Sequence, residues 1–361
     1  MERKTPLYDI HTELGGKIVP FGGYLLPIQY TGIIEEHMAV REKAGIFDVS
    51  HMGEVQLSGP DALRCVNHLC SNDFTNLAVG RARYTTMLNN DGGVIDDFLV
   101  YCLDKERYWL VVNASNRAKD VEWITRNIVG DIVAEDVSDS IGQVALQGPR
   151  SREIIAKLTP EADIPQKYFA FTEKASIGGL QCLLSRTGYT GSFGYEIYCK
   201  AADTPALWRK LLEAGAEYGL VPCALGARDT LRLEASMPLY GHEIDEHISP
   251  PEAGLEFAVK MSKPDFIGKA ALTAKGEPSL ARVGLRITGR GIARDGNEVY
   301  AGERRIGAVT SGTHLPYMKG AYAMAIVEKG FSAAGTALTV DIRGRRVEAE
   351  VVPMPFYSAP M

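Results

Sequence analysis

The 361-residue sequence has no apolar run that approaches the ~20 residues needed for a membrane-spanning helix. Its first residues, MERKTPLYDI, lack the hydrophobic core of a signal peptide. It also lacks a basic excess, because 39 Lys and Arg stand against 45 Asp and Glu, giving a net charge of −6. Nucleic acids are bound by clustered Lys and Arg. We therefore expect a cytoplasmic protein with neither a membrane nor a nucleic acid as its partner.

Several cofactor-binding motifs are also missing. The six cysteines form no CxxC pair, so reduced thiols are expected rather than a disulfide framework. The glycine-rich run GYTGSFG at 188–194 precedes a strand pattern rather than a helix, which does not fit a dinucleotide fingerprint. His242 and His247 are five residues apart, whereas the zinc-binding helix motif needs a spacing of four. No metal, pyridoxal phosphate or nicotinamide site is expected.

An internal repeat organises the first two thirds of the chain. VQLSGP at 55–60 and VALQGP at 144–149 each lead into a helix with Pro at its first turn. Strands and a second helix follow in both cases. The repeat predicts two tandem α+β units of β-α-β-β-α type, each with a ferredoxin-like antiparallel sheet.

From about Arg282 the pattern changes to short alternating strands separated by Gly-rich turns. This pattern predicts an all-β C-terminal domain of barrel or jelly-roll type. The expected domain bounds are 1–52 together with 141–262 for the first unit, 53–140 for the second, 263–281 for a linker and 282–361 for the β domain.

Local signals predict where two helices begin. Thr31 is expected to cap a helix that runs to about Lys43, and Thr204 is expected to cap a second helix that has Pro205 in its first turn. The Gly-, Pro- and aromatic-rich segment 21–30 is expected to be irregular.

The first candidate site lies in RYTTMLNNDGGVIDDFLVY, residues 83–101, which predicts two strands joined by a tight turn. Side chains alternate along a strand, so Asp96 and Asp97 must face opposite ways, and Asp97 shares its face with Leu99 and Tyr101. One carboxylate therefore meets a mostly apolar surface, where an unpaired charge is costly. Two interpretations remain open: a solvent-facing Asp beside a capped one, or a functional carboxylate near a tyrosine.

Two further charged residues are candidates. Glu196 stands in the apolar strand pattern YEIY and could face outward or line a site beside the glycine-rich run. In the predicted helix LGARDTLRLE, Arg228 and Arg232 share one face. That face could be a salt-bridged surface, or it could turn one guanidinium inward toward a planar polar partner.

Taken together, the segments resemble the glycine cleavage T-protein family almost from end to end. They are TPLYDIHTELGGKIVPFGGYLLPIQY, EEHMAVREKAGIFDVSHM, GGVIDDFLVY, TGYTGSFGYEIY, CALGARDTLRLEA and SGTHLPYMKGAYAMAIV. The resemblance implies three domains in a cloverleaf around a folate site, the last of them jelly-roll-like. It also implies an aminomethyltransferase that takes the aminomethyl group from the lipoyl arm of the H-protein. Tetrahydrofolate is the co-substrate, and the products are 5,10-methylenetetrahydrofolate, ammonia and the reduced carrier.

The resemblance also assigns residues. The catalytic aspartate of the GGxxDD strand matches Asp97, with Asp96 as the reserve, and the residues that hold the pterin ring match Glu196 and Arg228. Positions around the folate match Met52, Tyr84, Tyr101, Asn113 and Tyr189. PFYS at 355–358 lacks a basic residue found in some relatives, so the contact to the folate's glutamate tail is left unassigned.

Two alternatives come from the same superfamily, namely a folate-dependent demethylase and a non-enzymatic folate-binding assembly factor. Asp97 and the lack of a fused oxidase domain favour the aminomethyltransferase, and the cysteine motif of the assembly factors is not found. A monomer is expected outside the complex with the H-protein.

Overall fold

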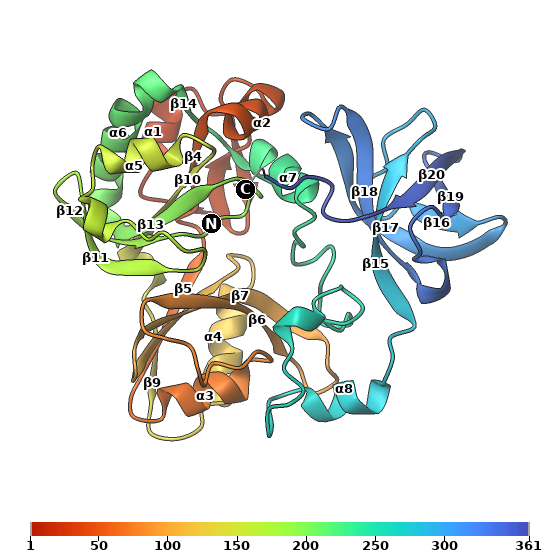
Figure 1. Cartoon of the computed structure of the whole chain (residues 1–361), viewed down its shortest axis with the longest axis horizontal. Helices are drawn as coiled ribbons and strands as arrows, with labels where there is room; N and C mark the ends of the chain where they lie inside the picture. Colours follow the sequence, from red (N-terminus) through yellow and green to blue (C-terminus); the bar gives the residue numbers. More distant parts are fainter. Residues whose placement is uncertain (1, 360–361) are drawn as a thin grey trace. The chain divides into compact units, whose positions relative to one another are not determined.

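The computed structural model describes residues 2–359 (Figure 1). Residue contacts divide the chain into two compact units. Unit 1 comprises Met1–Leu69, Phe74–Thr85 and Phe98–Arg228, and unit 2 comprises Cys70–Asp73, Thr86–Asp97 and Asp229–Met361. The domain bounds expected from the sequence stay a prediction. Within residues 2–359, the helices are all too short or too polar to cross a membrane.

The N-terminal segment forms a small sheet with the strand order β1-β3-β2, so the irregular structure expected at 21–30 is wrong. Its elements are β1 (Arg3–Lys4), α1 (Tyr8–Glu13), β2 (Ile18–Phe21) and β3 (Tyr24–Pro27). The β2–β3 hairpin turns at Gly22 and Gly23, whose φ angles of 55° and 82° favour glycine. The aromatic and proline residues around this turn obscured the short strands in the sequence.

The next helix, α2 (Ile33–Glu42), has Gly32 rather than Thr31 at its N-cap. The predicted Thr31 cap is therefore wrong. The Glu36 carboxylate instead accepts the backbone N–H groups of Tyr30 and Thr31, at 2.6 and 3.1 Å. A side chain from inside the helix thus reaches back to the preceding turn and accepts backbone N–H groups there, in place of the expected threonine cap.

A buried polar chain fastens α1 to the strand β4 (Ala44–Asp48). The Asp48 carboxylate lies 2.8 Å from His11 Nε2 and accepts from Thr5 Oγ1 at 2.7 Å and from the Ser50 N–H at 2.9 Å. Tyr30 Oη lies 2.8 Å from His11 Nδ1 and completes the chain. Burial alone would raise the pKa of the Asp48 carboxyl, but the hydrogen bonds and the His11 charge outweigh burial and lower it.

Asp48→Asn should therefore destabilise the protein at pH 7 by about 1.5–3 kcal/mol, the usual contribution of a hydrogen-bonded buried charge. Because the folded-state pKa is lowered, this contribution is complete above the ordinary pKa of Asp, about 3.9, and is lost as the pH falls through the folded value. Urea unfolding of both proteins between pH 7 and pH 3 measures the difference. Thr5→Val, which keeps the carboxylate, should lose less. Equal stability of Asp48→Asn and the wild type at pH 7 would contradict this account.

The larger sheet of unit 1 has the order β11-β12-β13-β10-β4-β14. Its other strands are β10 (Ile141–Gln147), β11 (Phe171–Ile177), β12 (Leu180–Ser185), β13 (Gly194–Lys200) and β14 (Leu220–Pro222). Helices α5 (Ser151–Ala156) and α6 (Thr204–Gly215) pack on the sheet over a core that includes Trp208. The N-cap of α6 is Asp203, so the predicted Thr204 cap is displaced by one residue and Thr204 is the first helical residue.

A second sheet has the order β6-β7-β8-β5-β9. Its strands are β5 (Gly53–Ser58), β6 (Arg81–Leu88), β7 (Val94–Asp104), β8 (Arg107–Val112) and β9 (Val133–Asp136), with helices α3 (Ala62–Leu69) and α4 (Arg117–Arg126). Tyr101 pairs with Trp109, which pairs with Gln56 on β5. The neighbouring row, with Leu99, Val111 and Glu54, lies on the same face because it is two residues along each strand.

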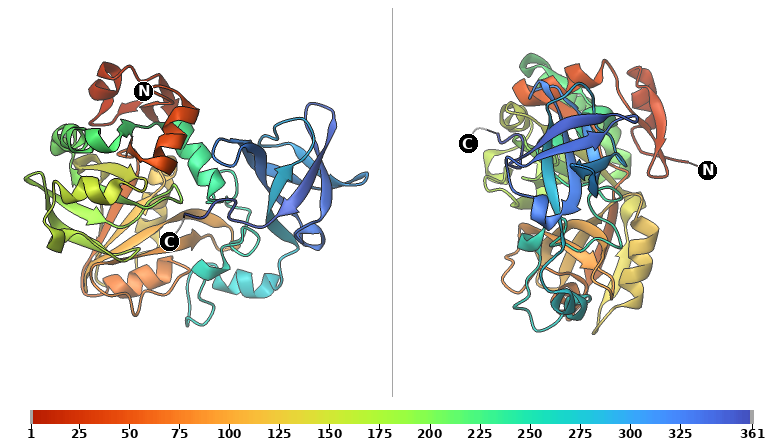
Figure 2. Two further views of the ribbon diagram at one scale, coloured as in Figure 1. Left: turned by 45° about the horizontal axis from the view of Figure 1, so that its top comes forward. Right: turned by 90° about the vertical axis from the view of Figure 1, so that its right-hand side faces the viewer.

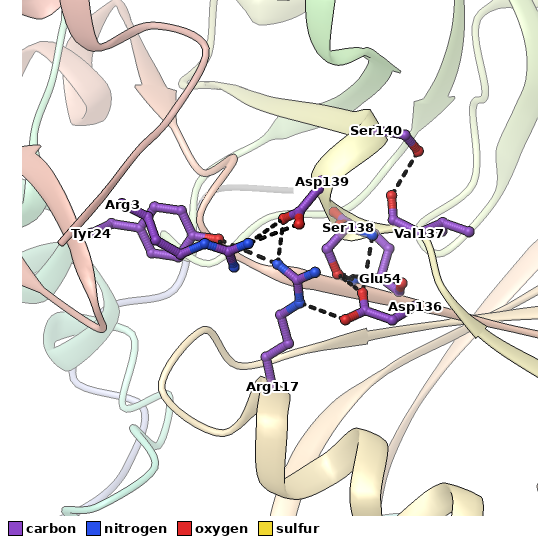
Figure 3. A network of polar contacts seen from close by, with 9 residues as sticks. All are labelled: Arg3, Tyr24, Glu54, Arg117, Asp136, Val137, Ser138, Asp139 and Ser140. Carbon is purple, nitrogen blue, oxygen red and sulfur yellow. Dashed lines mark hydrogen bonds and ion pairs between the residues drawn. The ribbon is translucent and has the colours of Figure 1, made fainter. Parts of the chain in front are cut away.

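A polar network joins the N-terminal sheet to this second sheet within unit 1 (Figure 3). Arg117 donates to Asp136 at 2.8 Å and to Asp139 at 2.7 Å. Arg3 donates to both carboxylate oxygens of Asp139 at 2.8 Å and to Tyr24 Oη at 3.1 Å. The network fixes β1 and β3 against α4, and with them the aromatic ring of Tyr24.

In unit 2, six antiparallel strands close into a barrel in the order β15-β18-β17-β16-β19-β20, seen from further directions in Figure 2. They are β15 (Leu280–Ile287), β16 (Glu298–Ala301), β17 (Arg304–Leu315), β18 (Gly320–Glu328), β19 (Ala337–Asp341) and β20 (Arg346–Val352). The expected α+β class with an all-β C-terminal domain is confirmed, and the domain is a closed barrel. Unit 2 also contains α8 (Lys269–Lys275), and α7 (Leu225–Glu234) runs from unit 1 into unit 2.

Candidate functional site

The two large sheets of unit 1 pack together through the faces that carry the candidate residues. Tyr101 and Val111 from one sheet share a buried cluster with Leu183 and Tyr198 from the other. Met52 packs against this cluster and is half-buried. Because side chains alternate along β13, Glu196 lies on the same face as Tyr198. The sequence-predicted residues Met52, Tyr101 and Glu196 are thus brought to one region.

Glu196 is buried, with 7% of its surface exposed, so the interpretation of an outward-facing glutamate is wrong. Gln143 Nε2 donates to its Oε1 at 3.2 Å. Burial raises the pKa of the Glu196 carboxyl, while hydrogen bonds from Thr187 and Gln143 and the positive charge of Arg228 act in the opposite direction. A buried carboxylate with this support can accept hydrogen bonds from a polar ligand.

Arg228 supplies the positive charge of this region. It lies on α7, and its guanidinium carbon is 4.7 Å from the ring centroid of Tyr189. Burial lowers the pKa of Arg228, but an arginine stays protonated in proteins. A planar cation beside an aromatic ring and a buried carboxylate suits a flat ligand with hydrogen-bond donors on its edge.

His51 also belongs to this region, although sequence reasoning did not single it out. Burial and the nearby charge of Arg228 lower the pKa of His51 to about 4, so its imidazole is neutral at pH 7. Its ring is edge-on to Phe21 at 5.8 Å and to Tyr24 at 6.4 Å between centroids. Its Nδ1 is buried with no hydrogen-bond partner among residues 2–359. The small N-terminal sheet therefore contributes aromatic rings to the surroundings of Arg228.

The two aspartates of β7 differ in exposure as strand alternation predicts. Asp96 is completely buried, at 0% exposure, while Asp97 is half-buried. Both belong to the part of β7 that lies in unit 2, and the third segment of unit 1 starts at the next residue, Phe98. Tyr84 and Asn113 are half-buried residues of unit 1. The roles given to these residues by the family resemblance are proposals.

The remaining candidate residues from the sequence have no place in this region. Arg232 is buried in unit 2, where it donates to Glu243 at 2.9 Å and to Ser311 at 2.8 Å, so this arginine serves the packing of the barrel unit. All six cysteines are buried free thiols. In residues 2–359, no three His, Cys, Asp or Glu side chains gather as metal ligands would.

Gln143 and Tyr198 were missed by the sequence reasoning, although a faint signal existed. Gln143 and Gln147 recur on the same face of the otherwise apolar strand β10, and Tyr198 follows Glu196 on one face of β13. Two polar residues on one face of a mostly buried strand indicate buried polar contacts on that face. This pattern alone does not identify the carboxylate with which these polar side chains form hydrogen bonds.

Comparisons with known proteins agree with this picture. Residues 7–263 match the model of the GCVT N-terminal domain, and residues 281–358 match the glycine cleavage T-protein C-terminal barrel domain. An aminomethyltransferase of Halalkalibacterium halodurans is 47% identical, and one of Bacillus cereus strain AH187 is 48% identical, with 98% of both chains covered in each case.

A solved structure gives the same answer for the whole fold. The crystal structure of glycine cleavage system aminomethyltransferase T from Bartonella henselae superposes with a TM-score of 0.92 at 31% identity, and the match covers 99% of each chain. Similarity of this extent in both sequence and structure covers both units of the chain. The chain therefore belongs to the glycine cleavage T-protein family.

Proposed function

We propose that this chain is the aminomethyltransferase of a glycine cleavage system. It takes the aminomethyl group carried on the lipoyl arm of an H-protein and transfers its methylene to tetrahydrofolate. The products are 5,10-methylenetetrahydrofolate, ammonia and the dihydrolipoyl carrier. Near-50% identity to aminomethyltransferases over 98% of the chain supports this reaction over a demethylase or an assembly factor.

The observation that carries the folate part is the buried Glu196 carboxylate next to Arg228, which lies over the Tyr189 ring. The edge of a pterin presents a ring N–H and an exocyclic amine, and a carboxylate can accept both. Arg228 and Tyr189 offer a planar cation and an aromatic face to the same flat group. Met52, Tyr84, Tyr101 and Asn113 complete the surroundings of the folate in this proposal.

The chemical step needs a group that handles a proton where the folate nitrogen meets the aminomethyl carbon. We assign this role to Asp97, with Asp96 as the reserve. The methylene carbon exchanges its bonds to the lipoyl sulfur and to the amino group for bonds to two folate nitrogens. The two protons that these nitrogens lose go to the sulfur, which leaves as a thiol, and to the amino group, which leaves as ammonia. A carboxylate at one of the nitrogens can accept its proton as the new carbon–nitrogen bond forms and pass it to a leaving group.

Tetrahydrofolate is a co-substrate in this proposal, and the chain's own residues need no metal, pyridoxal phosphate or nicotinamide for the transfer. The lipoylated H-protein must present the substrate, and the protein works in the cytoplasm as a monomer outside that transient complex. Charge complementarity would assist such an encounter.

A reconstituted assay tests the proposal. The chain, tetrahydrofolate and aminomethyl-loaded H-protein should yield 5,10-methylenetetrahydrofolate and ammonia in equal amounts. Replacing the loaded carrier with free glycine should yield neither product. No product from the loaded carrier would refute the proposed function, and product from free glycine by this chain alone would refute the requirement for a carrier.

A further inference from the structure

We propose that Gln143 is a positioning residue for Glu196, holding its carboxylate ionised and aimed at the ligand from the head of a chain of buried hydrogen bonds. This inference rests on the proposed function, because it deepens the role of Glu196 in folate binding. It adds a residue that the family resemblance did not assign.

The hydrogen-bond chain joins both sheets of unit 1. Gln143 Nε2 lies 3.2 Å from Glu196 Oε1 and 3.0 Å from Tyr198 Oη. Tyr198 Oη lies 3.1 Å from Tyr101 Oη, which lies 3.3 Å from Thr187 Oγ1. Thr187 Oγ1 in turn donates to Ser185 Oγ at 3.0 Å.

The chemistry of the members fixes the order of the donors. An ionised carboxylate only accepts, so Gln143 must donate to Glu196. The second hydrogen of the Gln143 amide goes to Tyr198 Oη, which leaves the Tyr198 hydroxyl hydrogen for Tyr101. Tyr101 can then donate to Thr187, whose own hydrogen goes to Ser185. The two amide hydrogens of Gln143 therefore start the order, and one of them goes to Glu196.

Strand pairing explains why a glutamine at this position reaches both partners. Gln143 is directly opposite Tyr198 in the β10–β13 pair, and Glu196 is the diagonal neighbour because it pairs with Ala145. Diagonal neighbours are 7–8 Å apart at Cα, within reach of a long side chain. The amide orientation follows from these partners, and Gln143 Oε1 is left buried with no hydrogen-bond partner among residues 2–359.

The charges around Glu196 leave its ionised state dependent on the Gln143 amide. The charge of Arg228 from α7 acts to lower the pKa of Glu196, and His51, which is near Arg228, is neutral at pH 7 and adds no charge. Tyr101, Tyr168 and Tyr198 are neutral phenols near Glu196, and burial together with the negative charge of Glu196 raises the pKa of each of them. Against the cost of burial, the ionised carboxylate thus depends on the charge of Arg228 and on the hydrogen bond from Gln143.

The test is the pH dependence of folate affinity, measured with 5-formyltetrahydrofolate by quenching of tryptophan fluorescence. In the wild type, affinity should fall as the pH falls through the pKa of Glu196. Gln143→Met removes the donor and should raise that pKa further. The ratio of the Kd of Gln143→Met to that of the wild type should therefore grow as the pH falls, and reach roughly tenfold or more, as expected for a lost hydrogen bond to a charge.

Three further variants separate positioning from general damage. Val144→Ala sits next to Gln143 on β10 but faces the apolar core, so it should lower stability while its Kd ratio stays constant with pH. In a Glu196→Gln background, which has no titrating carboxylate, the pH-dependent part of the Gln143→Met effect should vanish. If Gln143→Met does not fold, Gln143→Asn, which keeps an amide but is too short to reach Glu196, should show the same pH-dependent loss.

The outcomes distinguish this inference from the proposed function. A wild type that does not bind the reduced folate overturns both. A wild type that binds it, with a Gln143→Met Kd ratio that is independent of pH, overturns the positioning role alone. Titration of the ligand itself is common to all variants and cancels in the ratio.

Discussion

Asp97→Asn should slow aminomethyl transfer by about 10²–10⁴-fold at saturating tetrahydrofolate and carrier, the usual contribution of general acid–base catalysis. Asparagine keeps the shape of the side chain and still forms hydrogen bonds, but it cannot take a proton from the folate nitrogen. Folate affinity and the unfolding temperature should change little. Single-turnover rates with aminomethyl-loaded H-protein give the measurement, because they separate the chemical step from carrier release.

Asp96→Asn is the matched comparison, since the neighbouring residue carries the same group on the opposite face of β7. Asp96 is fully buried on the same face of β7 as the buried Phe98, whereas Asp97 is half-buried and can meet a ligand. Asp96→Asn should therefore lower stability more than it lowers the rate of transfer. A slow but stable Asp96→Asn together with an active Asp97→Asn would exchange the two assignments. Near-full activity of both would refute a catalytic carboxylate on this strand.

Local patterns in the sequence were sufficient for much of the fold. Alternation along β7 correctly gave Asp96 and Asp97 different environments, because the period of a strand depends only on its backbone. The helix predicted at 225–234 coincides with α7. The strand β16 has only four residues between turns, which carry too little periodicity to be recognised from the sequence.

The site was less predictable, because its parts meet only in three dimensions. Glu196 could not be placed inside or outside from its own strand, since the decision depends on Gln143, which is 53 residues away in the chain. The helix start at Ile33 is a different case, because Glu36, which replaces the expected Thr31 cap, is a local partner. A distant partner decided the placement of Glu196, and a single sequence does not show it.

The second large effect is expected at Glu196 itself. Glu196→Ala should weaken binding of a reduced folate by at least roughly tenfold, because a hydrogen bond to a charged group contributes about 1.5–3 kcal/mol. The loss should be greater than for Glu196→Gln, which still offers one acceptor oxygen. Isothermal titration at pH 7.5 with 5-formyltetrahydrofolate measures both, and far-ultraviolet circular dichroism checks that each variant is folded.

Glu54 offers a matched control for this measurement. It is another buried glutamate of unit 1, and burial raises its pKa well above the ordinary value. Glu54→Gln removes a buried carboxyl group to which the proposal gives no role in folate binding. Folate affinity should therefore be unchanged in Glu54→Gln but reduced in Glu196→Gln.

Arg228→Lys should bind folate nearly as poorly as Arg228→Ala, because an ammonium group cannot reproduce a planar guanidinium over the Tyr189 ring. Unchanged affinity in a folded Glu196→Ala would move the pterin site away from Glu196, and full rescue by Arg228→Lys would reduce Arg228 to a simple positive charge.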